Sequence, residues 1–196
     1  MRFFRQLCLA LCLPAALSAC ASSSASSGPV ISSGDRYAAS QDQAEDYALG
    51  AGDKLRITVF NEPTLSGEFA VSPDGSMSVP LVGALPVAGK KVEQVAALIQ
   101  TRLGDGYLRD PKVSAEVTTY RPFFILGEVK SPGQYPYASG MTLLNAVATA
   151  QGFTPRANRS VARIRQAGAA TESTYQVTPE LRVRPGDTIR IGERFF

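Results

Sequence analysis

Short runs in which apolar and polar residues alternate recur between residues 49 and 192, and they limit the fold more than any other feature of the sequence. Alternation of this kind is typical of strands with one buried face. One run occurs twice: residues 52–57 read GDKLRI and residues 186–191 read GDTIRI. In both, a Gly-Asp turn precedes the alternating residues. The sequence therefore predicts several short strands separated by tight turns.

The remaining periodic segments add further strands and two helices. Val92, Val95, Ile99 and Leu103 are spaced to share one helical face, and Gly104 follows as a stop signal. Thr142 is placed to cap a short helix that ends at Ala150. Strands are predicted at 112–119, on both sides of a turn at 131–133, and near 161–166, 174–178 and 188–192. A hairpin is predicted around Pro73-Asp74-Gly75, and the fold class is α+β.

The N-terminus has the pattern of a secretion signal. Two arginines precede an apolar core at residues 7–17, and small residues lead to Cys20. The core is too short to span a bilayer as a helix. The pattern is typical of a bacterial lipoprotein signal over residues 1–19, with cleavage between Ala19 and Cys20 and lipidation of Cys20. An ordinary secretory signal with an incidental cysteine is the alternative interpretation.

The residues after Cys20 suggest where such an anchor would place the chain. No aspartate follows at residues 21 and 22, the position that commonly retains lipoproteins in the inner membrane. We therefore expect the periplasmic face of the outer membrane, with attachment through several acyl chains. Residues 20–46 are rich in Ser, Ala and Gly and predict a flexible tether. The folded part is expected as two small mixed domains at 47–120 and 121–196, divided near Pro122.

The amino-acid inventory argues against most enzyme chemistry. The chain has no histidine, and its other two cysteines, Cys8 and Cys12, lie within the signal. This removes the usual zinc ligands, Ser-His-Asp triads and histidine bases. We predict no catalytic residue, metal site or cofactor. A carboxylate-dependent glycan hydrolase would need a pair among Asp53, Asp74, Glu128 and Asp187. The simpler interpretation makes Asp53 and Asp187 turn residues that bind local backbone.

Charge is distributed unevenly along the chain. Residues 20–120 carry 8 basic and 12 acidic side chains, whereas residues 121–196 carry 10 and 5. This polarity is compatible with head-to-tail docking of subunits, with binding of an acidic polymer, or with a simple solvated arginine surface. Nucleic acid is not an expected partner of a lipid-anchored envelope protein.

Two pairs of aromatic residues remain as candidate contacts. Tyr135 and Tyr137 are spaced to project from one face of a strand, where they would stack on sugar rings, pack in the core or contact another subunit. Phe195 and Phe196 end the chain, and exposed phenylalanines there favour contact with a partner.

The order of these pieces resembles a known family. A lipobox is followed by YALGAGDKLRITVF with AVSPDGSMSVPLVGALPVAG, and then by FFILGEVKSPGQYPYASGMTLLNAVATAQGF. The chain is similar to the Wza-like outer-membrane polysaccharide export proteins. Its first part resembles the polysaccharide export domain, and its second part resembles the SLBB domain, a β-grasp module.

The resemblance implies a homo-oligomeric ring in the periplasm that conducts a capsular polysaccharide or exopolysaccharide chain to the cell surface without enzymatic activity. Long members of the family continue to a C-terminal membrane helix, and this sequence stops at Phe196. The resemblance therefore implies a short type that docks beneath a separate outer-membrane β-barrel and above an inner-membrane polysaccharide copolymerase. The alternative function is a monomeric envelope lipoprotein that binds saccharide or another ligand.

Overall fold

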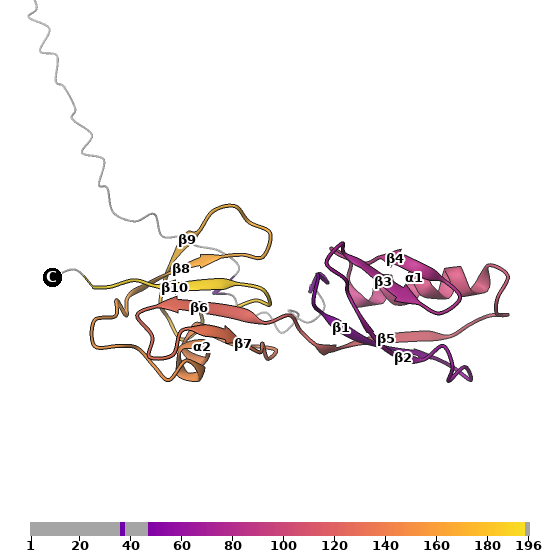
Figure 1. The fold of residues 1–196 in the computed structure, drawn as a ribbon, viewed down its shortest axis with the longest axis horizontal. Coiled ribbons are helices and arrows are strands. Elements are labelled where there is room, and N and C mark those ends of the chain that lie inside the picture. Colours follow the sequence, from indigo (N-terminus) through magenta and orange to yellow (C-terminus); the bar gives the residue numbers. More distant parts are fainter. Residues whose placement is uncertain (1–35, 38–46, 195–196) are drawn as a thin grey trace, which may run out of the picture.

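The computed structural model describes residues 36–37 and 47–194, which form two bodies that lie end to end (Figure 1). Each body combines one helix with a sheet and has its own hydrophobic core. The first core draws on residues between 47 and 117, and the second draws mainly on residues between 123 and 191. The predicted α+β class is confirmed.

The N-terminal body is built on a three-stranded antiparallel sheet in the order β2-β1-β5. Its central strand is β1 (Lys54–Val59), with β2 (Gly67–Ala70) and β5 (Val113–Thr119) on either side. Leu55, Ile57 and Val59 are buried, and the residues between them are exposed. The alternation in the sequence therefore predicted both the strand and its buried face.

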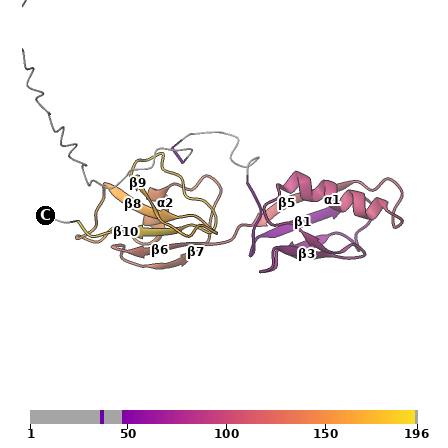
Figure 2. The ribbon, with the colours of Figure 1, turned by 90° about the horizontal axis from the view of Figure 1, so that it is seen from above.

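One face of this sheet is covered by helix α1 (Val92–Gly104) and by a second hairpin, β3 (Ser76–Val79) with β4 (Gly83–Pro86). The helix and the hairpin lie side by side over the sheet (Figures 1 and 2). The helix contributes Val95, Ile99 and Leu103 to the core, as its spacing predicted.

The predicted hairpin around Pro73-Asp74-Gly75 is wrong in its pairing. The turn itself forms, because the Gly75 N–H donates to the Ser72 carbonyl at 2.9 Å. The strands on its two sides then separate: β2 pairs with β1, and β3 pairs with β4. Alternation identifies strands but not their partners, and β4 had no strong alternating signal of its own.

The C-terminal body is a five-stranded sheet in the order β7-β6-β10-β8-β9. Its strands are β6 (Phe123–Gly127), β7 (Gly133–Tyr135), β8 (Val161–Arg165), β9 (Ser173–Gln176) and β10 (Thr188–Ile191). The two central strands β6 and β10 are parallel, and the other pairs are antiparallel. All five strands were predicted near these positions.

Helix α2 (Leu143–Thr149) covers one face of this sheet, behind it in the view of Figure 1. Its predicted cap is confirmed, since Thr142 Oγ1 accepts the Asn145 N–H at 3.3 Å. The inward-facing residues Phe123, Ile164 and Ile189 pack in the core beneath it. The opposite face is not covered by any described helix.

Two further observations concern the chain as a whole. No helix among residues 36–37 and 47–194 has both the length and the apolar character needed to cross a membrane. The expected tether at 20–46 needs a correction, because Arg36 and Tyr37 are packed against the C-terminal body. A buried arginine within a Ser- and Ala-rich segment leaves no periodic signal in the sequence.

Candidate functional site

The two Gly-Asp turns form equivalent structures that begin β1 and β10. Asp53 Oδ2 accepts the Gly50 N–H at 2.8 Å, and Asp187 Oδ2 accepts the Arg184 N–H at 2.9 Å. Both aspartates are buried. Their role in local backbone turns, the simpler interpretation of the sequence, agrees with these bonds. Each carboxylate also binds an arginine from a distant part of the chain.

Arg121 joins the two turns at the junction between the bodies. Its backbone N–H donates to Asp53 Oδ1 at 2.7 Å, and its side-chain Nη1 donates to Asp53 Oδ2 at 3.2 Å. On the other side, its Nε donates to the Pro185 carbonyl at 3.1 Å. A single guanidinium therefore holds the start of β1 against the start of β10, and we call this contact the Arg121 clamp.

Glycines make room for the Arg121 clamp. A Cβ added at Gly50 would lie 2.0 Å from Arg121 Nη1, and one at Gly186 would lie 2.8 Å from Arg121 Nε. Gly186 also has a φ of 81°, which side-chain-bearing residues rarely adopt. The glycines of both turns thus serve the junction as well as the turn.

Three tyrosines continue the junction beside the Arg121 clamp. The ring of Tyr120 meets Tyr47 edge-on at 5.0 Å between centroids and meets Tyr137 edge-on at 5.5 Å. The Tyr47 hydroxyl donates to Asp53 Oδ2 at 2.6 Å. Burial, reinforced by this bond, raises the pKa of Tyr47 well above its ordinary value.

The predicted aromatic pair Tyr135 and Tyr137 is engaged in packing. Tyr135 packs on Phe123, and its hydroxyl donates to the Ser131 carbonyl. Tyr137 meets the ring of Tyr120.

Arg36 binds the second turn. It is fully buried, its Nη1 lies 2.7 Å from Asp187 Oδ2, and its Nη2 lies 3.2 Å from Asp187 Oδ1. Its carbonyl accepts the Arg182 N–H, and the Tyr37 hydroxyl donates to the Gln176 carbonyl. Burial lowers the pKa of Arg36 because it disfavours a charged guanidinium. The hydrogen bonds to Asp187 and the Coulombic attraction between the two groups together have a larger effect, so the pKa of Arg36 is raised. We call these contacts the Arg36 latch.

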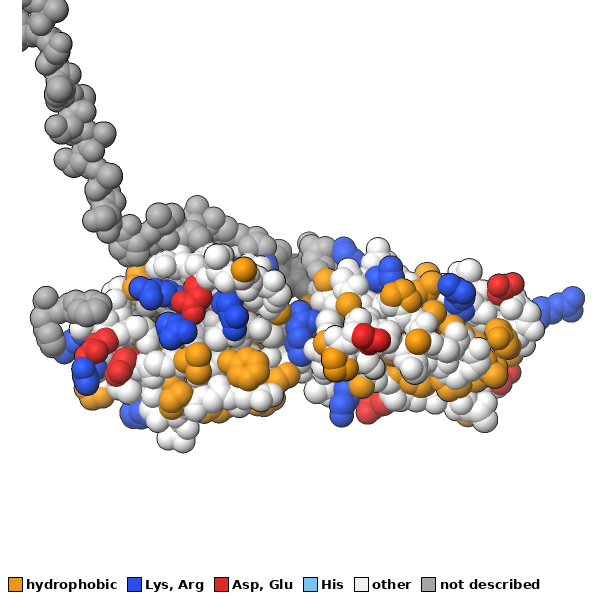
Figure 3. All heavy atoms as spheres, turned by 45° about the horizontal axis from the view of Figure 1, so that its top comes forward, with side chains coloured by type: hydrophobic (Ala, Val, Ile, Leu, Met, Phe, Trp, Pro, Cys, Tyr) orange, Lys and Arg blue, Asp and Glu red, His pale blue; other side chains and the backbone are white. Residues whose placement is uncertain are grey.

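The uncovered face of the C-terminal sheet carries three exposed arginines beside apolar side chains. We call it the arginine face and define it by Phe124, Leu126, Arg163, Arg165, Thr188 and Arg190. Figure 3 shows basic side chains gathered around an acidic one, next to hydrophobic side chains, on this half of the molecule. Among the arginines of this face, Arg190 donates from its Nε to Glu172 Oε1 at 3.0 Å.

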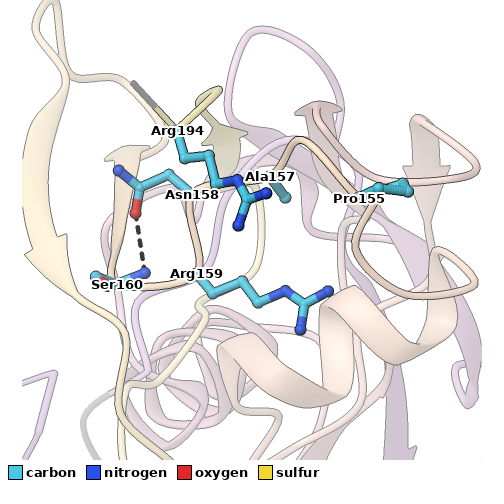
Figure 4. A pocket seen from close by; sticks show the side chains of 6 residues that line it. All are labelled: Pro155, Ala157, Asn158, Arg159, Ser160 and Arg194. Carbon is cyan, nitrogen blue, oxygen red and sulfur yellow. Dashed lines mark hydrogen bonds between the residues drawn. The ribbon is translucent and has the colours of Figure 1, made fainter. Parts of the chain in front are cut away.

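A shallow hollow of about 460 Å³ lies where β8 begins and β10 ends (Figure 4). In Figure 4 the side chains of Arg159 and Arg194 extend away from Asn158 into the same space. Asn158 Oδ1 accepts the Ser160 N–H at 2.9 Å and so fixes the loop. The Arg159 guanidinium lies 5.8 Å from the centre of the Phe153 ring. Pro155 and Ala157 complete the lining, and the chemistry of the hollow favours an anion.

The carboxylates proposed for hydrolysis have other partners. Asp74 accepts from the Ser76 N–H and hydroxyl, bonds that lower the pKa of Asp74. Glu128 accepts from the Thr154 hydroxyl. Asp53 and Asp187 hold Arg121 and Arg36. Within the described part of the chain, no three Asp, Glu, Cys or His residues are grouped to hold a metal ion. The geometry indicates structural roles for these carboxylates.

The sequence-predicted sites at the two ends, Ala19, Cys20, Phe195 and Phe196, lie outside the described residues. Sequence reasoning missed the Arg121 clamp and the Arg36 latch. For Arg121 the one signal in the sequence was its place beside Pro122, at the expected domain boundary. Arg36 offered no such signal.

Comparison with known proteins identifies both bodies. Residues 41–118 match the family model described as polysaccharide biosynthesis/export protein, and residues 122–178 match the SLBB domain. The chain is 38% identical over 157 residues to the exopolysaccharide production protein ExoF of Rhizobium meliloti, which covers 74% of this chain and 37% of ExoF.

Two further relatives agree with this assignment. The polysialic acid transport protein KpsD of Escherichia coli is 28% identical over 159 residues, 76% of this chain and 28% of KpsD. The EPS I polysaccharide export outer membrane protein EpsA of Ralstonia nicotianae is 27% identical over 187 residues, 78% of this chain and 49% of EpsA. The chain thus spans less than half the length of each relative. With an export domain followed by an SLBB domain, it belongs to the polysaccharide biosynthesis/export protein family.

Proposed function

We propose that this protein is a subunit of a periplasmic ring, anchored to the outer membrane, that conducts an exopolysaccharide or capsular polysaccharide chain to the cell surface. The observation that carries the proposal is the pair of matched domains in consecutive order. The relatives' names, which refer to exopolysaccharide production, polysialic acid transport and polysaccharide export at the outer membrane, support the same role.

In this role the protein makes and breaks no covalent bond. The absence of histidine from the sequence and the engagement of Asp53 and Asp187 with arginines support a transport role. A conduit works through a wide polar surface that binds each unit weakly, because tight binding would stall the polymer.

The proposed attachment rests on the lipoprotein-type signal, and the proposed partners rest on the likeness to polysaccharide export proteins. Cleavage between Ala19 and Cys20 frees Cys20 for lipidation, and the lipid holds the chain on the periplasmic face of the outer membrane. Domains at 47–120 and 121–196 form the ring wall. The ring docks onto an inner-membrane polysaccharide copolymerase and a separate outer-membrane pore protein, and Phe195 and Phe196 contact one of these partners.

The test of the export role compares polysaccharide outside the cell with polysaccharide retained inside, in a deletion strain and in the same strain complemented with the gene. We expect loss outside the cell and recovery on complementation. Unchanged surface polymer in a strain without another exporter of this family would contradict the role.

The mass of the purified lipidated protein separates a ring from the alternative, a monomeric lipoprotein that binds saccharide. A closed oligomer is expected. A monomer at all concentrations tested, in detergent that preserves other envelope assemblies, would favour the binding protein.

Two variants test the ends. Cys20→Ala is expected to give an unlipidated, mislocalised protein with impaired export, and a membrane-bound lipidated variant would refute the anchor. Removal of Phe195 and Phe196 is expected to reduce capture of the copolymerase or pore partner while leaving the thermal unfolding midpoint unchanged. Undiminished capture would exclude these residues from the contact.

A further inference from the structure

The arginine face is ordered by the register of the sheet into two rows that cross its strands. In the first row Gln134, Phe124, Thr188 and Arg165 are successive partners, and in the second Leu126, Arg190, Arg163 and Thr174 are. Positions i and i+2 on a strand project from the same face, so Arg163 and Arg165 lie on it together. The three arginines therefore form a compact exposed group next to Phe124 and Leu126.

The N-terminal sheet provides an internal comparison, because Arg56 occupies in GDKLRI the position that Arg190 occupies in GDTIRI. Arg56 lies between two acidic cross-strand partners, Glu68 and Glu116, each 3.4 Å away. The charge of Arg56 is thus balanced by its cross-strand neighbours, as expected for an arginine whose role is to stabilise a solvent-exposed sheet face. Arg190 has Arg163 and Leu126 as its cross-strand partners.

The pairing of Arg190 with Arg163 opposes folding. Like charges placed directly opposite each other on neighbouring strands are destabilising. Glu172 offsets this repulsion only in part, since it binds Arg190, and Arg163 has no ion-pair partner within residues 36–37 and 47–194. A bound anion between the two arginines would relieve this repulsion.

We propose that the arginine face binds the anionic sugar units of the exported polymer, so that the substrate is an acidic polysaccharide. This inference rests on the proposed export function and specifies its substrate class. Guanidinium groups form paired hydrogen bonds with carboxylate and phosphate. Phe124, which is 39% exposed, offers a ring against which the apolar face of a sugar stacks.

The shape of the face suits a moving polymer. Its three arginines are exposed to solvent on neighbouring strands. Water screens each contact between an arginine and a sugar carboxylate, so each contact is weak and the polymer is held by several at once. The hollow lined by Arg159 and Arg194 lies where β8 begins and β10 ends, so two more basic side chains stand at that end of the domain. Arg182, by contrast, is engaged within the domain, where its Nη1 donates to the Gly140 carbonyl at 2.7 Å.

The direct test measures binding of fluorescent decagalacturonate, a carboxylate-bearing oligosaccharide, to the purified full chain, with a neutral dextran oligosaccharide of the same length as the comparison. We expect binding of decagalacturonate that weakens as salt is added, and no binding of dextran. The variant Arg163→Gln/Arg165→Gln removes two charges from the arginine face and is expected to weaken binding about tenfold.

The matched control is Arg102→Gln/Arg109→Gln, which removes the same net charge from exposed positions of the N-terminal body. It is expected to change binding less than about twofold, since screening limits the effect of charges outside the site. Equal weakening by both variants would mean that net charge alone attracts the probe and would overturn the site.

A stability measurement distinguishes a binding face from a structural one. If Arg163 is retained for binding, Arg163→Thr removes the repulsion with Arg190 and places a good strand former there, so the thermal unfolding midpoint rises by a few degrees while decagalacturonate affinity falls. A lowered midpoint with unchanged affinity would overturn the proposal.

Two results separate this inference from the export function. If the deletion strain loses surface polymer but a strain carrying Arg163→Gln/Arg165→Gln exports normally and its protein binds the probe normally, the arginine face is excluded and the export role stands. If the purified double variant loses its oligomeric mass, the face is a contact between copies, and polymer binding by the arginine face is overturned. Loss of both probe binding and export, with unchanged mass, supports polymer binding by the arginine face.

Discussion

Arg36 Nη1 lies 2.7 Å from Asp187 Oδ2, although 150 residues separate the two in the chain and neither side chain is exposed to solvent. The contact ties the segment before the first domain to the turn that begins the last strand. We expect Arg36→Gln to destabilise the C-terminal domain by about 3 kcal/mol, because it leaves a buried carboxylate without its charged partner. Chemical denaturation measures this loss.

The exposed Arg56 supplies the control for the Arg36 latch. Arg56→Gln removes a charge that is screened by solvent and is expected to cost less than about 1 kcal/mol. Faster hydrogen exchange at the Arg182 amide, which donates to the Arg36 carbonyl, is expected in Arg36→Gln only. Equal losses of stability in both variants would refute a special role for the latch.

The Arg121 clamp predicts that the orientation of the two domains depends on one side chain. In Arg121→Gln the bonds to Asp53 and to the Pro185 carbonyl are lost or weakened. We expect a broader distribution of distances between spin labels placed at Ser114 and Thr174, one on each sheet, measured by pulsed electron paramagnetic resonance. Arg159→Gln lies at the opposite end of the C-terminal sheet, where β8 begins and β10 ends, and should leave the distribution unchanged. An unaltered distribution in Arg121→Gln would show that other contacts fix the junction.

Alanine substitutions at two glycines with the same backbone conformation distinguish the cost of a steric clash from the cost of backbone strain. Gly127 and Gly152 have φ of 88° and 91°, but only at Gly127 would a Cβ meet an atom, the Ile191 carbonyl oxygen at 2.1 Å. Gly152→Ala is expected to cost about 1 kcal/mol, and Gly127→Ala clearly more, because β6 must move away from β10. The difference between their unfolding free energies measures the closeness of the parallel pair. Equal costs would contradict the predicted clash.

The junction is expected to weaken at alkaline pH. The pKa of Tyr47 is raised by burial and by its bond to Asp53, so the folded protein keeps a proton that the unfolded chain releases above about pH 10. Stability from this group is complete below that pH and declines as pH rises. Tyr47→Phe cannot ionise and should show a smaller decline in the unfolding midpoint between pH 9 and pH 11.5.

Tyr120 and Tyr137 also have raised pKa values because of burial, so part of the alkaline decline remains in Tyr47→Phe. At pH 7 the same variant loses a bond to a charged group and is expected to be less stable by about 1.5 kcal/mol. Identical pH profiles for the two proteins would assign the alkaline loss to other groups.

The sequence was sufficient for those features that depend on local periodicity. The buried residues of β1 and α1 and the cap at Thr142 were all predictable, because each is determined by neighbours a few residues away. Strand partners were harder, and the turn at Gly75 joins two different sheets. The turn roles of Asp53 and Asp187 could be predicted, but their arginine partners could not, because those contacts span 68 and 151 residues.

The Arg36 latch also determines how many residues separate the proposed lipid on Cys20 from the folded part of the protein. From Cys20 to Arg36 there are 16 residue steps, against 27 to Tyr47, where the first domain begins. A fully extended chain covers at most about 3.3–3.6 Å per residue, so the latch shortens the maximum reach from roughly 89–97 Å to roughly 53–58 Å. With the proposed lipid in place, mechanical load from the membrane would reach the SLBB domain first. Release of all the contacts of the Arg36 latch would let the protein move nearly 40 Å farther from that anchor, by the same estimate of roughly 3.3–3.6 Å per residue.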